Sequence, residues 1–150
     1  MITLDHIHPM LVHFPLVLLP LAVVLDLVAH ARGDQGRRGF AALATAAYVG
    51  GAAAAGLAAM FGDVAVDIAI GKGFPAGLFE THEDLAIATT VLFSAVAAVR
   101  LVTLWRGLGR GFVRATTGLA ALGVVLLLAV AYEGGALVYD HGVNVAAVMR

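Results

Sequence analysis

Histidine is the residue type of this sequence with the clearest potential for chemistry. The chain has six histidines, and two of them, His13 and His82, lie close to one end of a long apolar segment. An ionisable side chain at such a depth is costly in lipid and normally faces the interior of a bundle. Two imidazoles on different helices at similar depth are the axial ligands that a bis-histidine haem b requires. We therefore predict haem b bound by His13 and His82, with His141 supporting or replacing one of them.

A non-haem metal site is the second interpretation of the same histidines. Three or four imidazole and carboxylate ligands suit zinc, copper or iron. Besides the terminal amine, the cations of this region are Lys72 and Arg150, and this acidic setting favours a bare cation over an anionic porphyrin. The third interpretation is that the histidines bind no cofactor and form hydrogen bonds at the membrane interface. The candidate metal ligands are His8, His13, His82, His141 and Glu133.

Several other kinds of chemistry are excluded or not indicated. The chain contains no cysteine, which excludes disulfides, thiolate metal sites, iron–sulfur clusters and c-type haem attachment. It has no glycine-rich phosphate loop, no Ser–His–Asp arrangement and no basic face for nucleic acid. No enzyme class is therefore favoured, and no nucleic-acid partner is expected. The opening residues MITLDHIHPM lack a basic region, so we expect no cleaved signal peptide.

The elements that must position the histidines are transmembrane helices. Hydrophobic residues make up 61% of the chain and charged residues 13%, whereas a soluble domain has about 45–50% and about 25%. Crossing about 30 Å of hydrocarbon takes roughly 20 helical residues, and four stretches are long enough. Short glycine-containing connections after the first and third stretches predict antiparallel neighbours. We predict one all-α domain over residues 1–150, an up-down-up-down four-helix bundle with spans at about 9–31, 40–61, 82–105 and 112–138.

Charge predicts the orientation of this bundle in the membrane. Seven arginines lie in or beside the first and third connections, and the acids on that side are Asp26 and Asp34. Arginine beside short loops is retained on the cytoplasmic side. Both termini, the 62–80 connection and every histidine except His30 are then periplasmic, in a bacterial inner membrane. The seven arginines are Arg32, Arg37, Arg38, Arg100, Arg106, Arg110 and Arg114.

Small residues and prolines predict how the helices pack. Glycine and alanine recur between residues 50 and 59, so the second helix can approach its neighbours closely. Pro15 and Pro20 remove backbone donors and should kink the first helix close to His13, and the alternative is that they are simply tolerated, as proline is in membrane helices. Thr81 is expected to cap the third helix and thereby to orient the histidine that follows it. The glycine pair 134–135 allows either close backbone approach or a break in the fourth helix.

The remaining charged and aromatic groups receive simpler interpretations. Arg100 is expected to anchor the third helix at the cytoplasmic interface. Asp26 is expected to pair with a loop arginine or with His30. Phe74 and Phe79 make the 62–80 connection an expected interfacial lid over the outer mouth of the bundle.

Two segments of the chain resemble a known family. They are HPMLVHFP at residues 8–15 and GGALVYDHGV at residues 134–143, combined with a histidine at the start of the third helix. These features resemble bacterial predicted membrane proteins of the domain-of-unknown-function family numbered 2231, over nearly the whole chain. The resemblance implies a four-helix membrane domain, sometimes joined to cytochrome c-type modules, and it carries over no reaction. It carries over His8, His13, His82 and His141 as candidate site residues.

Two functions from different classes follow from this reasoning. The first is a small b-type haem protein that passes electrons between the quinone pool and a periplasmic c-type cytochrome within a larger complex. The second is a cofactor-free accessory subunit of a respiratory or photosynthetic complex, which the small-residue second span and the thin polar surface suit. A transporter is disfavoured because no acid lies at mid-depth in a span and no inverted repeat is detectable.

Overall fold

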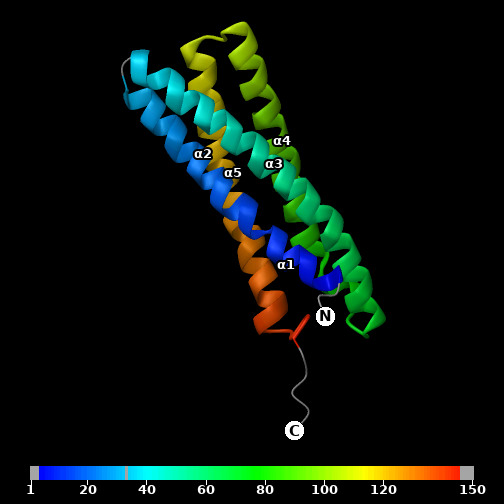
Figure 1. Cartoon of the computed structure of the whole chain (residues 1–150). Helices are drawn as coiled ribbons and strands as arrows, with labels where there is room; N and C mark the ends of the chain where they lie inside the picture. The colour runs from blue at the N-terminus through cyan, green and yellow to red at the C-terminus, as the bar shows by residue number, and fades with distance from the viewer. Residues whose placement is uncertain (1–3, 33, 146–150) are drawn as a thin grey trace.

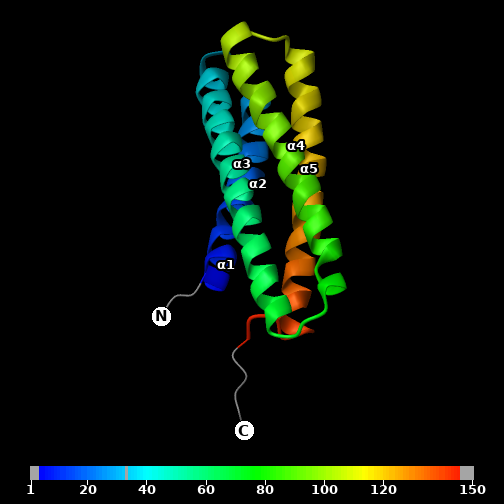
Figure 2. The ribbon, with the colours of Figure 1, turned by 90° about the vertical axis from the view of Figure 1, so that its right-hand side faces the viewer.

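The computed structural model describes residues 4–32 and 34–145, and this part of the chain is built from helices joined by short connections. Helices α2 to α5 run alternately in opposite directions, and α1 leans on α3 (Figures 1 and 2). The described chain therefore begins and ends at the same end of the bundle. In chain order the elements are η1 (Leu4–His6), α1 (Ile7–Leu11), α2 (His13–Ala31), α3 (Asp34–Gly71), η2 (Ala76–Leu78), α4 (Glu80–Arg106) and α5 (Arg110–Tyr139).

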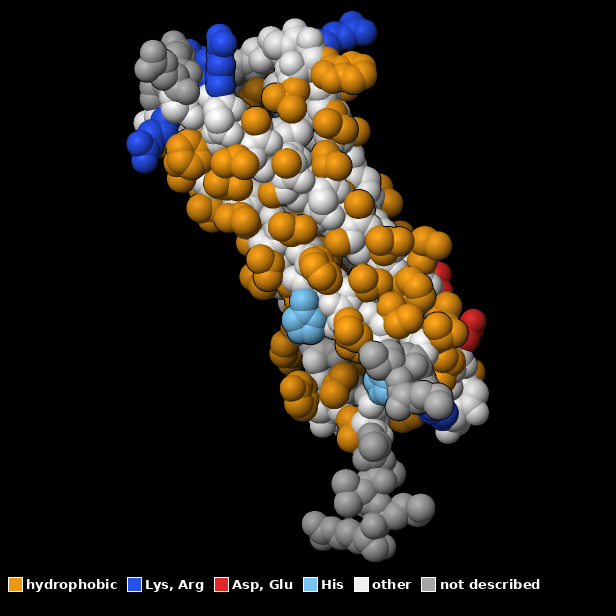
Figure 3. All heavy atoms as spheres, viewed as in Figure 1, with side chains coloured by type: hydrophobic (Ala, Val, Ile, Leu, Met, Phe, Trp, Pro, Cys, Tyr) orange, Lys and Arg blue, Asp and Glu red, His pale blue; other side chains and the backbone are white. Residues whose placement is uncertain are grey.

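Four of these helical segments are long and apolar enough to cross a membrane, which confirms the predicted all-helical class. In the most apolar window of each, only 17–28% of the residues are buried inside the protein. Most of the apolar surface therefore faces outward and needs lipid to cover it. Figure 3 shows hydrophobic side chains over the long sides of the bundle, with most of the basic side chains, all of them arginines, gathered at one end. The spans are Ile7–Ala31, Gly36–Gly71, Glu80–Arg106 and Arg110–Tyr139.

The two ends of the bundle hold different residues. The arginine end holds the end of α2, the start of α3 and the 107–109 connection with the adjoining ends of α4 and α5. The histidine end is opposite and holds η1, α1, the 72–79 connection and residues 140–145.

Helix α3 is longer than predicted. It has 38 residues, about 57 Å at 1.5 Å per residue, and it continues ten residues beyond the predicted end at residue 61. The extension keeps a helical pattern, because Ala69 is buried while Asp63 and Asp67 lie exposed on the other face. Gly62 does not start a turn. A Cβ there would lie 3.2 Å from the His8 ring, so this glycine allows close approach within a continuous helix.

A break between α1 and α2 confirms the predicted effect of proline near the start of the first span. Helix α1 ends at Leu11 and α2 begins at His13. Pro15 has no N–H, so the Leu11 carbonyl lacks its partner four residues ahead, and the proline ring crowds that carbonyl. Pro20 lies inside α2 without ending it. The bend directs α1 across α3 instead of along the axis of α2 (Figure 1).

The predicted cap of the third helix is wrong. Helix α4 begins at Glu80, one residue before Thr81, and its start has no side-chain hydrogen bond. The preceding residue, Phe79, is 2% exposed. Packing of this aromatic ring, rather than a hydroxyl cap, therefore positions the beginning of α4 and with it the His82 side chain.

An ion pair lies buried in the half of the bundle nearer the arginine end. Arg100 is 3% exposed and Asp26 is 1% exposed, and the Arg100 guanidinium donates to the Asp26 carboxylate. The other Asp26 oxygen accepts hydrogen bonds from Tyr48 at 3.3 Å and from Thr117 at 3.0 Å. All four long helices therefore contribute to one polar cluster. The expected interface anchor at Arg100 is wrong, as is the expected pairing of Asp26 with a loop arginine or His30, because the interior carboxylate needs a cation at its own depth.

Close contact between α2 and α3 depends on Gly51. This residue faces the fully buried Leu19 within the apolar core, which also contains Tyr48 and Phe93. A Cβ built at Gly51 would lie 2.5 Å from Leu19 Cδ2 and 2.7 Å from Leu19 Cγ. Gly56, in the same helix, has nothing within 4 Å of the equivalent position.

The Gly51→Ala variant is expected to be less stable than the wild type by about 1–3 kcal/mol, because overpacking forces α2 and α3 apart. Unfolding in mixed detergent micelles measures the difference. Gly56→Ala is the matched control and should be neutral or slightly stabilising, since alanine favours the helix more than glycine does. Equal stability of the two variants would contradict the predicted contact.

Candidate functional site: a histidine pair at a pocket

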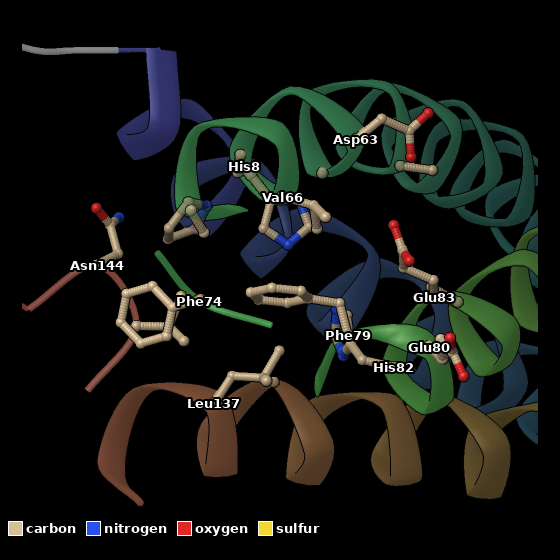
Figure 4. Close-up of a pocket in the computed structure, with 18 of the residues that line it drawn as sticks. His8, Asp63, Val66, Phe74, Phe79, Glu80, His82, Glu83, Leu137 and Asn144 are labelled. Atoms are coloured by element: carbon tan, nitrogen blue, oxygen red, sulfur yellow. The ribbon is translucent and has the colours of Figure 1, made fainter. Parts of the chain in front are cut away.

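The structure brings His8 of α1 and His82 of α4 together at the histidine end. Their ring centroids are 6.2 Å apart, and the planes of the two rings are almost perpendicular, at 85°. Both side chains are half-buried. The residues are 74 positions apart in sequence, so only the packing of α1 across α3 makes them neighbours. Figure 4 shows both imidazoles at the wall of one pocket.

Backbone carbonyls determine which nitrogen of each ring carries hydrogen. His8 Nδ1 lies 2.7 Å from the Ala58 carbonyl oxygen on α3. His82 Nδ1 lies 3.2 Å from the Val130 carbonyl oxygen on α5. A carbonyl oxygen only accepts hydrogen bonds, so each Nδ1 must donate. In the neutral rings, each Nε2 then keeps its lone pair, which is the arrangement typical of metal-binding histidine.

A glycine sits beside each ring. A Cβ at Gly62 would lie 3.2 Å from His8 Cε1 and Nδ1, and a Cβ at Gly134 would lie 3.1 Å from His82 Cε1. Each imidazole is therefore packed against bare backbone, which limits its rotation. Helix α5 continues through Gly134 and Gly135 to Tyr139. Of the two alternatives predicted for this glycine pair, the structure therefore has close approach of the His82 ring to the α5 backbone, and not a break in the helix.

The pocket beside the pair has a volume of about 490 Å³, which lies within the range of about 300–1,000 Å³ usual for small-molecule sites. Its α3 wall consists of small side chains at helical spacing, from Ala59 to Ala69. Phe79, which precedes α4, and Leu137 of α5 also line it (Figure 4). The pocket thus combines a broad apolar interior with two imidazoles.

Carboxylates surround the mouth of this pocket. Asp63 of α3 and Glu80, Glu83 and Asp84 of α4 line it, and all but the half-buried Glu83 are exposed. Lys72 also lines it. The potential at the mouth is therefore negative, which attracts cations and opposes anions.

The structure separates two of the other predicted ligands from this pair. His13 is exposed at the start of α2 and does not face the bundle interior, and His141 is exposed beyond the end of α5. Glu133 is half-buried in α5, and its charge acts on the His82 imidazole. Among the described residues, no group of three or more His, Asp or Glu side chains is placed to hold a metal ion. The five-residue metal set His8, His13, His82, His141 and Glu133 is therefore not assembled, and its only close histidine pair in the described chain is His8–His82.

Sequence reasoning included His8 as a metal ligand but not as a partner of His82 in a haem site. A signal for it existed, because five residues of α-helix turn by about 140° beyond a full circle. His8 and His13 therefore cannot both face inward from one continuous helix. The bend before His13 decides which of the two histidines faces inward. The sequence indicated a kink in this region but not its direction.

Substituting Gly134 tests whether the backbone holds the His82 ring. Gly134→Val is expected to displace the imidazole and weaken its hydrogen bond to the Val130 carbonyl, since a Cβ alone already comes within 3.1 Å of the ring. Nitrogen NMR of labelled histidine should show hydrogen on Nδ1 in the wild type and a mixture of tautomers in the variant. Gly135→Val is the control, because a Cβ at that position has nothing within 4 Å. An unchanged His82 tautomer in Gly134→Val would contradict this interpretation.

Comparison with known proteins agrees with the assignment of the chain to a membrane. The family description "Predicted membrane protein (DUF2231)" matches residues 5–147, a range that includes α1, the histidine pair and all four spans. No curated protein and no solved structure matches the chain. Because the match extends over nearly the whole sequence, the chain belongs to the DUF2231 family of predicted membrane proteins.

Proposed function

We propose that this membrane protein binds haem b at the histidine end and transfers electrons there, with His8 and His82 as the two axial ligands. The observation that carries the proposal is the pair of imidazoles from separate helices, each with Nδ1 bonded to a carbonyl and Nε2 left as a ligand. His8 here takes the place that the sequence suggested for His13. A bis-histidine haem changes the oxidation state of its iron without exchanging ligands, which suits one-electron transfer.

The separation of the rings supports a shared central ion. Two imidazole nitrogens, each bonded at about 2.0–2.1 Å to one metal, are ~4 Å apart, and the centres of the two rings are then ~6 Å apart. The observed centroid distance is 6.2 Å. The carbonyl partners and the adjacent glycines hold the rings in place, which reduces the cost of ordering them when a ligand binds.

The pocket suits a flat apolar group in its interior and is less suited to an anion at its mouth. The small α3 side chains offer a smooth wall for a ring system, and Phe79 and Leu137 offer an apolar opposite surface. Lys72 is the cation that lines the mouth, among four carboxylates. That charge balance favours a second candidate, a bare transition-metal ion such as zinc, copper or iron held by the same two nitrogens with water completing the coordination.

The location and partners of the protein follow from the same proposal. The arginine end should face the cytoplasm of a bacterial inner membrane, because arginines gather there, and the histidine end should face the periplasm. Electrons would then be exchanged with a c-type cytochrome or with quinone at the periplasmic surface, within a larger membrane complex. The acidic mouth would attract a basic partner surface.

An optical spectrum of the purified protein tests the proposal. The full chain is produced with ample haem supply and isolated in mild detergent, and spectra are recorded before and after reduction with dithionite. A Soret band that shifts on reduction, at about one haem per chain, is the expected result. Absence of a Soret band in both redox states overturns the haem proposal. Elemental analysis of the same sample then distinguishes a metal site from a cofactor-free accessory subunit.

A further inference from the structure

A groove on the lipid-facing surface lies between α2 and α5 near the arginine end, far along the bundle from the histidine pair. Its volume is about 300 Å³. It combines one imidazole and one guanidinium with a short apolar extension, and the Thr117 hydroxyl is already hydrogen-bonded to Asp26 and to the Val113 carbonyl. The residues that line it are Leu27, His30, Arg114, Thr117, Gly118 and Ala121.

His30 is the first reason to expect a ligand in this groove. Its Nε2 atom is buried and has no hydrogen-bond partner among the described residues. A buried polar atom without a partner costs about 1–3 kcal/mol. An acceptor seated in the groove would remove that cost by taking a hydrogen bond from the imidazole once the ring turns toward it, because Nε2 has almost no exposed surface in its present orientation.

Arg114 supplies charge at the same place. It lies in the second turn of α5, and its exposed guanidinium can reach an anion at the interface. Other arginines surround this end of the bundle (Figure 3), whereas Asp26 is already neutralised by Arg100 in the interior. The local field therefore attracts anions to the groove.

The apolar part of the groove runs away from Arg114 toward the membrane interior. Gly118 and Ala121 follow Arg114 by four and seven residues, so they lie one and two turns deeper on the same face of α5. A Cβ at Gly118 would have nothing within 4 Å, which leaves a slot between the helices. Leu27 of α2 forms the other side of it.

We propose that this groove binds one anionic phospholipid. Its phosphate is held by Arg114 and by the His30 imidazole, and the upper part of an acyl chain lies against Gly118 and Ala121. Phosphate above an apolar slot, at a cationic end of a transmembrane bundle, is the chemistry of an anionic lipid at a membrane interface. The proposal does not depend on the function proposed for the histidine pair, which lies at the opposite end.

Native mass spectrometry of the full chain tests this, with phosphatidylglycerol, phosphatidylcholine or inorganic phosphate added to the detergent-solubilised protein. The wild type should retain one phosphatidylglycerol and bind phosphatidylcholine at least about tenfold more weakly. Gly118→Leu fills the slot without changing the charge, and Arg114→Gln removes the cation. Each should reduce retention of phosphatidylglycerol by about tenfold.

Arg106→Gln is the matched control, because it removes an exposed arginine from the same end but outside the groove. It should retain phosphatidylglycerol as the wild type does. Helical content by circular dichroism shows that each variant is folded. Equal retention by Gly118→Leu and wild type, equal binding of both lipids, or equal loss in Arg106→Gln would overturn the proposal. Binding of inorganic phosphate that Gly118→Leu leaves unchanged would also overturn it, by showing a small-anion site instead.

Discussion

The Arg100→Met variant is expected to lose about 3–5 kcal/mol of folding stability, because removing one partner of a buried ion pair leaves the other charge uncompensated. Asp26 is 1% exposed and lies among the four spans. Tyr48 and Thr117 donate hydrogen bonds to it but carry no positive charge. Unfolding in mixed micelles, followed by circular dichroism, measures the loss.

The double variant Asp26→Leu, Arg100→Met separates the ion pair from the shape of the core. It removes both charges together, and apolar replacement of a complete buried pair is often neutral or stabilising. We expect it to recover most of the stability that Arg100→Met loses. The remaining deficit belongs to the Tyr48 hydroxyl, which then lacks the Asp26 acceptor, whereas Thr117 keeps its bond to the Val113 carbonyl. A double variant as unstable as the single one would show that packing of the Arg100 side chain, and not charge, stabilises the bundle.

His8→Ala and His82→Ala are each expected to lower haem affinity by more than ~100-fold, because an axial ligand contributes more than an outer-shell partner, whose loss costs about 10–100-fold. The two substitutions remove imidazoles that face one pocket from α1 and α4. Titration of the apoprotein with haemin, read at the Soret band, measures the affinity of each variant. The double variant should bind still more weakly than either single variant, because each single variant keeps one imidazole that can bind the iron.

His13→Ala and His141→Ala are the matched controls. Each removes an exposed imidazole from the histidine end, and each should bind haem as the wild type does. Loss of binding in His13→Ala with retention in His8→Ala would reverse the assignment and restore the ligand pair that the sequence alone suggested. Normal helical content in all four variants is required for the comparison, and circular dichroism supplies it.

The buried ion pair shows where sequence reasoning stopped short. Phe93, Val96 and Arg100 follow one another at spacings of three and four residues, so they share one face of α4. That face is the buried one. The spacing therefore contained a signal that Arg100 faces the interior, but the number of arginines beside the connections suggested an interface anchor. The partner of Arg100 depended on the rotation of α2, which its nearly uniform apolar sequence does not specify.

The His8–His82 pair shows a different limit. A histidine at the start of the third helix and two more at the start of the first were evident from the residues, as was the end of the bundle where they gather. The pairing of His8 with His82 was not, because the direction of His8 depends on the bend before His13 and on the packing of α1 against α3. The role of Gly62 and Gly134 also became evident only from the histidine rings that pack against them. A glycine in a helix indicates that something approaches closely without indicating what approaches.

The sequence by itself determined four apolar helices, the short first and third connections and the segregation of most arginines from most histidines, because length, hydropathy and charge are properties of each segment taken alone. Tertiary structure decided which polar groups meet inside those helices: His8 with His82, and Asp26 with Arg100. The physical reason is that the apolar side chains of a membrane helix can contact lipid on every side at no cost. Its hydrophobic pattern therefore leaves its rotation open, and the contacts of a few glycines, prolines and buried charges determine it.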